Sequence, residues 1–320
     1  MSTIAEFART LHETNPTQAA RALTPMSYPS AGQSVKDIRA LIFDVYGTLF
    51  NYWKPAFVTE ASRTAALLDA FSKTIAFFNM APYITAINPA DSPEKTLSDF
   101  YHGLIAIKHN VLQEKGIEFP EVKIEEVWQA ILLMLKRRGY RYTGQCIIDE
   151  DDLPRCMAYY YNFCAHNRGL YPGVYGALQE LKKNGISLGI LSNAQFYTVI
   201  DLTLNLREQS NNALDDAGEL FDRDLMFFSF EYAMAKPGHI LFRRLFDALY
   251  EYQILPSQVV FVGNDLASDI KPAQEAGMKT ALFTGDAHSL FLHDLAGEVI
   301  PDISFSSWSD LPRMISLGEK

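Results

Sequence analysis

From residue 174 to residue 305, short apolar runs of strand type alternate with segments in which apolar residues recur at helical spacing. The predicted strands of this region are Ile186–Leu191, Met226–Ser229, Gln258–Val262, Thr280–Phe283 and Asp302–Phe305. The predicted helices are Val174–Asn184, Ala194–Leu206, His239–Tyr250 and Ile270–Ala276. Helices that alternate with strands connect parallel strands and cover both faces of the sheet. The pattern therefore predicts an α/β fold built on a doubly wound parallel sheet.

One further strand of this sheet is expected much earlier in the chain. The apolar run Arg39–Val45 ends abruptly in turn residues, and Gly47 suits a tight turn or the close approach of a ligand. The segment that follows has only helical spacing, and its predicted helices are Val58–Met80, Ser98–Gly116, Lys123–Arg138 and Leu153–His166. We therefore expect a core domain of residues 39–57 and 168–320, with a second, all-helical domain of residues 58–167 inserted after the first strand.

Residues 1–38 form an N-terminal extension of different composition. Pro16, Pro25 and Pro29 interrupt any long helix, and only Ile4–His12 has the spacing of a short amphipathic helix. We expect this extension to be disordered, or to dock on the core domain or on a partner subunit.

The composition of the chain is that of a folded globular protein. Hydrophobic residues make up 48% and charged residues 21% of the 320 residues, which argues against a disordered or collagen-like polymer. The net charge of −10 disfavours binding to nucleic acid or anionic lipid, because both require a basic surface. Three cysteines without a Cys-x-x-Cys pair are typical of a reducing compartment. We therefore expect a cytoplasmic protein that binds neither nucleic acid nor membranes.

Four polar signals lie at or just after the ends of predicted strands. They are Asp44, Ser192, Lys236 and the pair Asn264-Asp265. In open parallel sheets, ligands bind outside the carboxyl ends of the strands, so these side chains are expected to meet at one site. A carboxylate, a hydroxyl, an ammonium group and an acidic cluster can together hold a divalent cation and a phosphate-sized anion. One carboxylate then remains available as a nucleophile.

The segments around these residues have the order and spacing of a known set of motifs. They are Phe43-Asp44-Val45-Tyr46-Gly47-Thr48-Leu49, Leu191-Ser192-Asn193, Ala235-Lys236-Pro237 and Val262–Ile270. In this respect the sequence resembles the haloacid dehalogenase-like (HAD) hydrolase superfamily, over about residues 39–312. The resemblance implies a Rossmann-like core, and it places the helical domain where the family carries its C1-type cap domain.

The resemblance also implies catalytic roles for four residues. Asp44 would be the nucleophile that forms an aspartyl intermediate, which water then cleaves. Thr48 and Ser192 would donate hydrogen bonds to the oxygens of the transferred group. Lys236 would offset the negative charge of that group, because phosphoryl transfer depends mostly on positioning and electrostatics.

Substrate and metal contacts are implied in the same way. Tyr46, Gly47 and Asn193 would contact the substrate. Mg²⁺ prefers oxygen ligands and keeps several waters. The implied protein ligands are Asp44, the backbone carbonyl of Tyr46, and Asp265 or Asp269.

Two positions depart from the pattern of the family's phosphatases. Tyr46 stands where they carry a second Asp as general acid and base, and tyrosine there resembles the metal-independent 2-haloacid dehalogenases. Those enzymes lack the paired acids of the fourth motif and use a cap arginine, and Arg63 is the only arginine between residues 50 and 80. Asn264 stands where a first Asp is common, which makes Asp265 the stronger candidate for a direct ligand.

The acidic fourth motif outweighs the first, because its carboxylates near Asp44 would concentrate negative charge unless a cation lay between them. We therefore predict a Mg²⁺-dependent HAD-like hydrolase, a phosphatase that acts on a small phosphorylated metabolite through an aspartyl-phosphate. The alternatives are a metal-independent dehalogenase and a non-catalytic member that binds a ligand. The expected partner is a small anionic substrate, and a homodimer is left open.

Several of these residues also have purely structural interpretations. Ser192 would be the N-cap of a helix that begins near Ala194. Asp265 and Asp269 would be acids that favour the positive end of a helix, and Asp269 would otherwise hold Lys236. A basic cluster in the helical domain, residues 136–138 with residue 141, is typical of a solvated helix end; the alternative is a surface that steers an anionic substrate.

Overall fold

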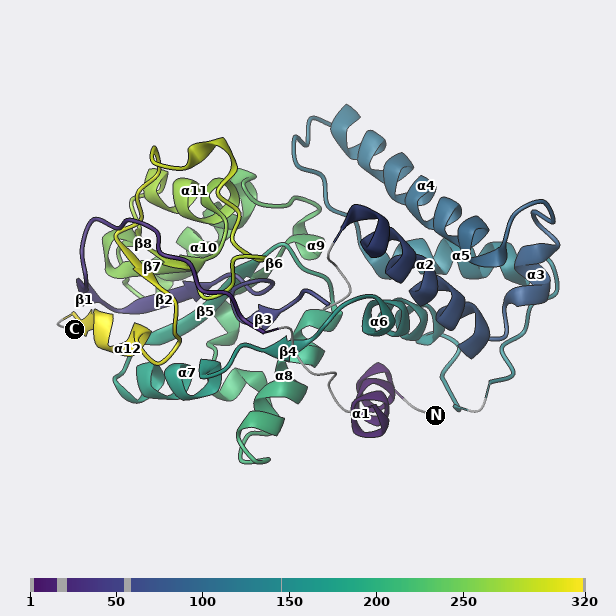
Figure 1. Ribbon diagram of the computed structural model, residues 1–320, viewed down its shortest axis with the longest axis horizontal. Coiled ribbons are helices and arrows are strands. Elements are labelled where there is room, and N and C mark those ends of the chain that lie inside the picture. Colours follow the sequence, from purple (N-terminus) through teal and green to yellow (C-terminus); the bar gives the residue numbers. More distant parts are fainter. Residues whose placement is uncertain (1–2, 16–21, 55–58, 145, 319–320) are drawn as a thin grey trace. The chain divides into compact units, whose positions relative to one another are not determined.

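The computed structural model describes residues 3–15, 22–54, 59–144 and 146–318. The chain forms two compact units (Figure 1). The first, the helical unit, comprises Met1–Ala20 and Lys54–Asn167, and the second, the core unit, comprises Arg21–Trp53 and Arg168–Lys320. No helix within the described ranges is both long and apolar enough to span a membrane.

The core unit is built on a six-stranded sheet in the order β6-β5-β2-β7-β8-β9, with every neighbouring pair parallel. The strands are β2 (Ala40–Phe43), β5 (Ser187–Ser192), β6 (Met226–Phe228), β7 (Val259–Gly263), β8 (Lys279–Phe283) and β9 (Ile303–Phe305). Counted along the chain, this is the doubly wound order 3-2-1-4-5-6, in which the direction of winding reverses between β2 and β7. The predicted α/β fold with a parallel sheet is confirmed.

The central strand β2 explains why this region of the sequence is apolar throughout rather than alternating. Leu41 and Phe43 pack into a cluster with residues of α7 (Val174–Lys183) and α8 (Tyr197–Gln209). Ala40 and Ile42 point to the opposite face and pack with residues of α10 (His239–Glu251) and α11 (Lys271–Glu275). A parallel strand covered by helices on both faces has no solvent side, so every position favours an apolar residue.

The core unit also contains short elements that the sequence pattern did not predict. They are β1 (Val35–Ile38) paired with β10 (Ile315–Leu317), β3 (Phe50–Asn51) paired with β4 (Gly169–Leu170), α9 (Ser229–Tyr232) and α12 (Leu311–Met314). Each has two to four residues, which is too short to show a period. The helical segment therefore follows β3, and three short strands precede it instead of one.

The helical unit contains α1 (Ile4–Thr14), α2 (Glu60–Phe77), α3 (Ala81–Thr85), α4 (Pro93–Glu114), α5 (Ile124–Lys136) and α6 (Leu153–Ala165). Aromatic side chains connect α2 with α6. Phe71 stacks on Tyr161 with ring centroids 4.2 Å apart, and Phe77 stacks on Tyr160 at 4.1 Å. The consecutive tyrosines of α6 are therefore packing residues of this unit.

The N-terminal extension divides between the two units. Phe7 on α1 is 3% exposed and packs edge-on against Phe77 and Tyr159, so this helix belongs to the helical unit. In the core unit, the backbone N–H of Met26 donates to the carbonyl of Thr284. The sequence predicts disorder, or docking on the core domain or on a partner subunit, and packing of α1 on the helical unit is not among these alternatives. Residues 16–21 lie outside the described residues.

Candidate active site

Asp44 lies directly after β2, at the point where the winding of the sheet reverses. Its carboxylate is buried, and Oδ1 accepts hydrogen bonds from the Ser192 hydroxyl at 3.0 Å and from the Lys236 ammonium at 2.7 Å. Ser192 ends the neighbouring strand β5, and α8 is capped at Phe196. Ser192 is therefore not a helix cap; it fixes the orientation of Asp44.

The turn after Asp44 brings the chain close to the fourth motif. Gly47 has φ +84°, and a Cβ at this position would lie 2.5 Å from the side-chain nitrogen of Asn264. Only glycine combines this backbone conformation with so close a contact. The Thr48 hydroxyl, fully buried, donates to Asn264 Oδ1 at 2.8 Å and lies 3.4 Å from Asp44 Oδ2. Gly47 thus allows the turn to approach Asn264, and Thr48 connects Asn264 with Asp44 by hydrogen bonds.

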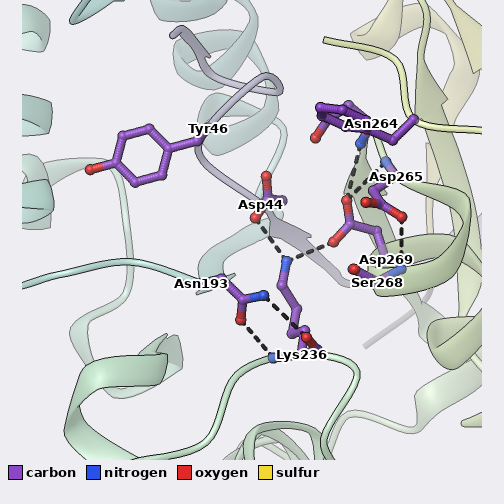
Figure 2. A pocket seen from close by; sticks show the side chains of 9 residues that line it. Asp44, Tyr46, Asn193, Lys236, Asn264, Asp265, Ser268 and Asp269 are labelled. Carbon is purple, nitrogen blue, oxygen red and sulfur yellow. Dashed lines mark hydrogen bonds and ion pairs between the residues drawn. The ribbon is translucent and has the colours of Figure 1, made fainter. Parts of the chain in front are cut away.

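Lys236 connects two buried carboxylates. Its ammonium donates to Asp44 Oδ1 at 2.7 Å and to Asp269 Oδ1 at 2.6 Å (Figure 2). Asn193 holds the backbone of Lys236 through a reciprocal pair of hydrogen bonds, 2.6 and 3.2 Å long. Burial alone would lower the pKa of Lys236, but Asp269 and Asp44 together raise this pKa above its ordinary value. The lysine is therefore held as a cation.

Asp269 is turned toward the protein rather than toward an open position. Its Oδ2 accepts the backbone N–H groups of Asn264 and Asp265, both at 3.1 Å, while Oδ1 receives Lys236. Burial raises the pKa of Asp269, and the charge of Lys236 opposes this effect. Of the two roles expected for Asp269, the geometry matches the one in which it holds Lys236.

Asp265 caps the short helical turn Leu266–Ile270. Its Oδ1 accepts the backbone N–H groups of Ala267 at 2.7 Å and Ser268 at 2.9 Å, and His293 Nε2 lies 3.0 Å from the same oxygen. The structural interpretation of Asp265 as a helix-terminal acid thus applies. Its second oxygen accepts no hydrogen bond from the described residues.

These groups surround a pocket of about 160 Å³ (Figure 2). Of the residues predicted for the site, those that line the pocket are Asp44, Tyr46, Asn193, Lys236, Asp265 and Asp269. Asn264, expected at the site as part of the Asn264-Asp265 pair but given no role there, also lines the pocket. Ser268 and Phe291 were not predicted as site residues, and Ser268 lies inside the fourth motif. Phe291 gave no signal, because an isolated β-bridge with Asp265, far from it in the sequence, brings it there.

Tyr46 lines the pocket with its ring but not with its hydroxyl. In Figure 2 the phenol points away from Asp44, and its oxygen lies 2.8 Å from the Thr198 hydroxyl on α8. Burial, followed by the nearby charge of Asp201, raises the pKa of Tyr46 well above its ordinary value. This side chain is therefore a neutral wall of the pocket and does not exchange protons near neutral pH.

The charges around the pocket do not balance. Three carboxylates, those of Asp44, Asp265 and Asp269, line it together with the ammonium group of Lys236, which donates hydrogen bonds to Asp44 and Asp269. Within the described part of the chain, no three His, Cys, Asp or Glu side chains are grouped so as to hold a metal ion by themselves. The site is thus a pocket lined by more acidic than basic side chains.

Comparisons with known proteins identify the family of the chain. A family model for haloacid dehalogenase-like hydrolases matches residues 38–277, which is more than half of the chain. The ribulose-1,5-bisphosphate 5-phosphatase of Halopiger xanaduensis is 27% identical over 186 residues, covering 53% of this chain and 72% of that protein. The glyceraldehyde 3-phosphate phosphatase of Pyrococcus furiosus is 32% identical over 112 residues, covering 35% of this chain and 41% of that protein.

A solved structure shares the fold. The 2-haloacid dehalogenase of Pseudomonas syringae pv. tomato superposes with a TM-score of 0.52 at 18% identity, and the match covers 87% of this chain and 97% of that one. Sequence motifs, sheet order and family model therefore agree, and the chain belongs to the haloacid dehalogenase-like hydrolase family.

Proposed function

We propose that the protein is a Mg²⁺-dependent phosphatase that hydrolyses a small phosphorylated molecule through an aspartyl-phosphate at Asp44. The observation that carries this proposal is the surplus of negative charge at the pocket, where three carboxylates face one ammonium group. Two related proteins are named as phosphatases, which supports the same chemistry.

The residues present fit a magnesium ion. Mg²⁺ usually takes one or two carboxylates from a protein, keeps several waters and completes its shell with substrate phosphate. Among the residues that the structure describes, one carboxylate oxygen of Asp265 has no donor, and Asp44 Oδ2 has only a long contact with Thr48. We expect Asp44, Asp265 and the backbone carbonyl of Tyr46 to hold the ion. When bound, it would supply positive charge for the phosphoryl oxygens.

The protein's own groups account for the remaining steps. The Asp44 carboxylate attacks phosphorus, so that a carboxylate–phosphorus bond forms and the bond to the leaving oxygen breaks. Lys236, fixed by Asp44 and Asp269, keeps a positive charge beside the transferred group. Water then attacks the aspartyl-phosphate, which releases inorganic phosphate and restores the carboxylate.

The first motif restricts the choice of leaving group. Tyr46 occupies the place of a general acid, and its hydroxyl is directed to Thr198 instead of the pocket. A general acid contributes about 10²–10⁴-fold when the leaving group is basic. We therefore expect acyl or aryl phosphates, whose leaving groups depart without a proton, to be better substrates than alkyl phosphates.

The second candidate is a metal-independent 2-haloacid dehalogenase, in which Asp44 would attack carbon. It is favoured by Tyr46 and by Asn264, an amide at a position where a metal-binding carboxylate is common in the family. A third candidate is a member without activity that binds an anionic ligand in this pocket.

A substrate panel separates the three. The purified full-length protein is assayed with acetyl phosphate, p-nitrophenyl phosphate, glycerol 3-phosphate and 2-chloropropionate, with Mg²⁺ and with chelator. We expect phosphate release from the first two that needs Mg²⁺, and loss of this release in Asp44→Asn. Chloride release in chelator would establish the dehalogenase instead. If no compound were turned over, the result would favour the third candidate, a member that binds a ligand without activity.

A further inference from the structure

A buried polar cluster of the core unit lies against the turn that follows Asp44, and the proposed hydrolysis gives it no role. It consists of Tyr171, Asp286 and Ser289, and we call it the Asp286 cluster. Tyr171 directly follows β4, and the other two residues follow β8. The three side chains are 0%, 3% and 1% exposed. None of them lines the pocket at Asp44, so none is placed to touch the substrate.

Hydrogen bonds to one carboxylate hold the cluster together. Asp286 Oδ2 accepts the Tyr171 hydroxyl at 2.9 Å and the Ser289 hydroxyl at 3.1 Å, and the two hydroxyl oxygens lie 2.8 Å apart. Asp286 Oδ1 accepts the backbone N–H of His288 at 3.1 Å. Burial raises the pKa of Tyr171 above its ordinary value, so this hydroxyl keeps its proton. These donors compensate a buried carboxylate that would otherwise be costly.

The backbone carbonyl of Ser289 connects the cluster with the fourth motif. It accepts a hydrogen bond from Nδ2 of Asn264, a residue that is 3% exposed. Because a carbonyl oxygen can only accept, the amide of Asn264 must direct its nitrogen to Ser289 and its oxygen to Thr48. The same loop packs against the first motif, since a Cβ at Gly47 would lie 3.1 Å from Cβ of Ser289. The loop that carries the cluster therefore fixes the orientation of this amide.

The orientation of the amide decides where the proton of Thr48 goes. This hydroxyl has one proton, and its contact with Asn264 Oδ1 at 2.8 Å is much shorter than its contact with Asp44 Oδ2 at 3.4 Å. The stronger hydrogen bond is therefore the one to Asn264. Asp44 Oδ1 accepts from Ser192 and Lys236, whereas the long contact with Thr48 is the only hydrogen bond of Oδ2 in the described part of the chain. Oδ2 is thus the oxygen that remains for the reaction.

The same contacts give a reason for an amide at residue 264, where a carboxylate is common in the family. An aspartate here would place a carboxylate oxygen against the carbonyl of Ser289, and neither atom could donate a hydrogen bond. Buried polar atoms without a partner are unfavourable. The surroundings therefore favour asparagine over a metal-binding acid.

We propose that the Asp286 cluster positions the nucleophile through Asn264, so that Asp44 Oδ2 stays free of a strong hydrogen-bond donor and can attack the substrate. Tyr171, Asp286 and Ser289 are positioning residues, because they act through Asn264 and not on the substrate itself. The proposal rests on the nucleophilic role of Asp44 in the proposed function. Loss of the cluster should therefore lower kcat and leave KM unchanged.

Steady-state kinetics of Tyr171→Phe tests this role. The variant removes one hydroxyl of the cluster and keeps the ring, whose centroid lies 4.9 Å from that of Phe283. With a substrate that the unmodified protein hydrolyses, kcat should fall by about tenfold at constant KM. Tyr175→Phe on α7 is the matched control and should keep the kcat of the unmodified protein, because its hydroxyl accepts from Gln179 outside the cluster. An unchanged kcat in Tyr171→Phe, or a loss confined to KM, would overturn the proposal.

Asn264→Asp tests the amide itself. This variant should lower kcat further than Tyr171→Phe does, because it removes the donor to the Ser289 carbonyl, and additional Mg²⁺ should not restore the activity. A kcat equal to or above that of the unmodified protein would show that residue 264 acts as a metal ligand and would contradict the proposal.

A double-mutant cycle of stability needs neither activity nor Mg²⁺. Urea denaturation is measured for Tyr171→Phe, Asn264→Ala and the double variant. Because hydrogen bonds link the two residues, the double variant should lose less free energy of unfolding than the sum of the two single losses. Tyr175→Phe combined with Asn264→Ala should be additive. Additivity of the first pair would overturn the proposal. Coupling in a protein that hydrolyses no compound of the panel would support the link to Asn264 and refute only the phosphatase.

Discussion

Lys236 determines how two buried carboxylates coexist at this site. A buried ammonium group is costly unless it is paired, and here two carboxylates accept its hydrogen bonds at 2.6 and 2.7 Å. Asp269 also accepts hydrogen bonds from two backbone N–H groups, so both of its carboxylate oxygens are hydrogen-bonded within the protein. Asp44 and Asp265 each keep a carboxylate oxygen that can bind a ligand in the pocket. Residues of the same chemical type thus have different roles because their hydrogen-bond partners differ.

The variant Asp269→Asn distinguishes a role of Asp269 in positioning Lys236 from a role in binding Mg²⁺. The variant removes one of the two charges that hold Lys236, so kcat should fall by about 10–100-fold, the usual effect of losing such a supporting contact. The Mg²⁺ concentration for half-maximal activity should stay unchanged, because neither oxygen of Asp269 is open. Steady-state kinetics at varied Mg²⁺ measures both quantities.

Asp247→Asn, an exposed acid on α10, is the matched control and should behave as the unmodified protein. A rise of tenfold or more in the Mg²⁺ requirement of Asp269→Asn, with kcat preserved at saturation, would instead identify Asp269 as a direct ligand.

At the scale of elements, the apolar periodicity of the sequence predicts the long helices, whereas the short strands depend on pairing with neighbouring segments. The helices α2, α5 and α6 begin and end within three residues of the predicted bounds, because each buries an apolar stripe. The helix α4, of which only Thr96 and Leu97 are buried, begins five residues before the predicted start. The two-residue strands β3 and β4 pair with each other, and Phe50 of β3 also forms a bridge with Tyr46. The helix α1 has a clear amphipathic pattern, but the pattern does not say which surface receives it.

Phe7→Ala tests the placement of α1 on the helical unit. Phe7 is 3% exposed and contacts aromatic rings of α2 and α6, so its truncation should lower the free energy of unfolding by about 3 kcal/mol. Urea denaturation measures this loss. Arg9→Ala, on the exposed side of the same helix, should change stability by less than about 0.5 kcal/mol. Equal stability of both variants would show that α1 does not pack there.

At the scale of the whole molecule, we expect acid stability to depend on a histidine at the end of α6. Burial lowers the pKa of His166 to about 3, with Lys54 and Arg63 acting in the same direction. The unfolded chain binds a proton at this residue near its ordinary value of about 6.5, whereas the folded chain does not. Stability is therefore present above about pH 6.5 and is lost as the pH falls toward 3.

His166→Gln tests this linkage. The unmodified protein should lose about 2 kcal/mol of unfolding free energy from this residue between pH 7 and pH 5, and the variant should not. Urea denaturation at the two pH values gives the difference. His239→Gln, at an exposed position of α10, is the control and should keep the pH dependence of the unmodified protein. Identical pH dependence of all three proteins would contradict the assignment.

The sequence by itself determined the α/β class, the winding of the sheet and the residues that meet at its carboxyl edge. Apolar runs and helical spacing are local patterns, and a parallel sheet necessarily brings the ends of its strands together. Asp44, Ser192, Lys236 and Asp269 are therefore in direct contact, although up to 225 positions separate them along the chain.

The tertiary structure decided what each of these residues does. The direction of the Tyr46 hydroxyl, the use of both oxygens of Asp269 and the arrival of Phe291 at the pocket depend on partners from other elements. The same holds for α1 and for the Asp286 cluster. Local periodicity specifies that a face will be buried. The segment against which that face packs is decided only in the folded chain, because it depends on contacts between segments that are distant in the sequence.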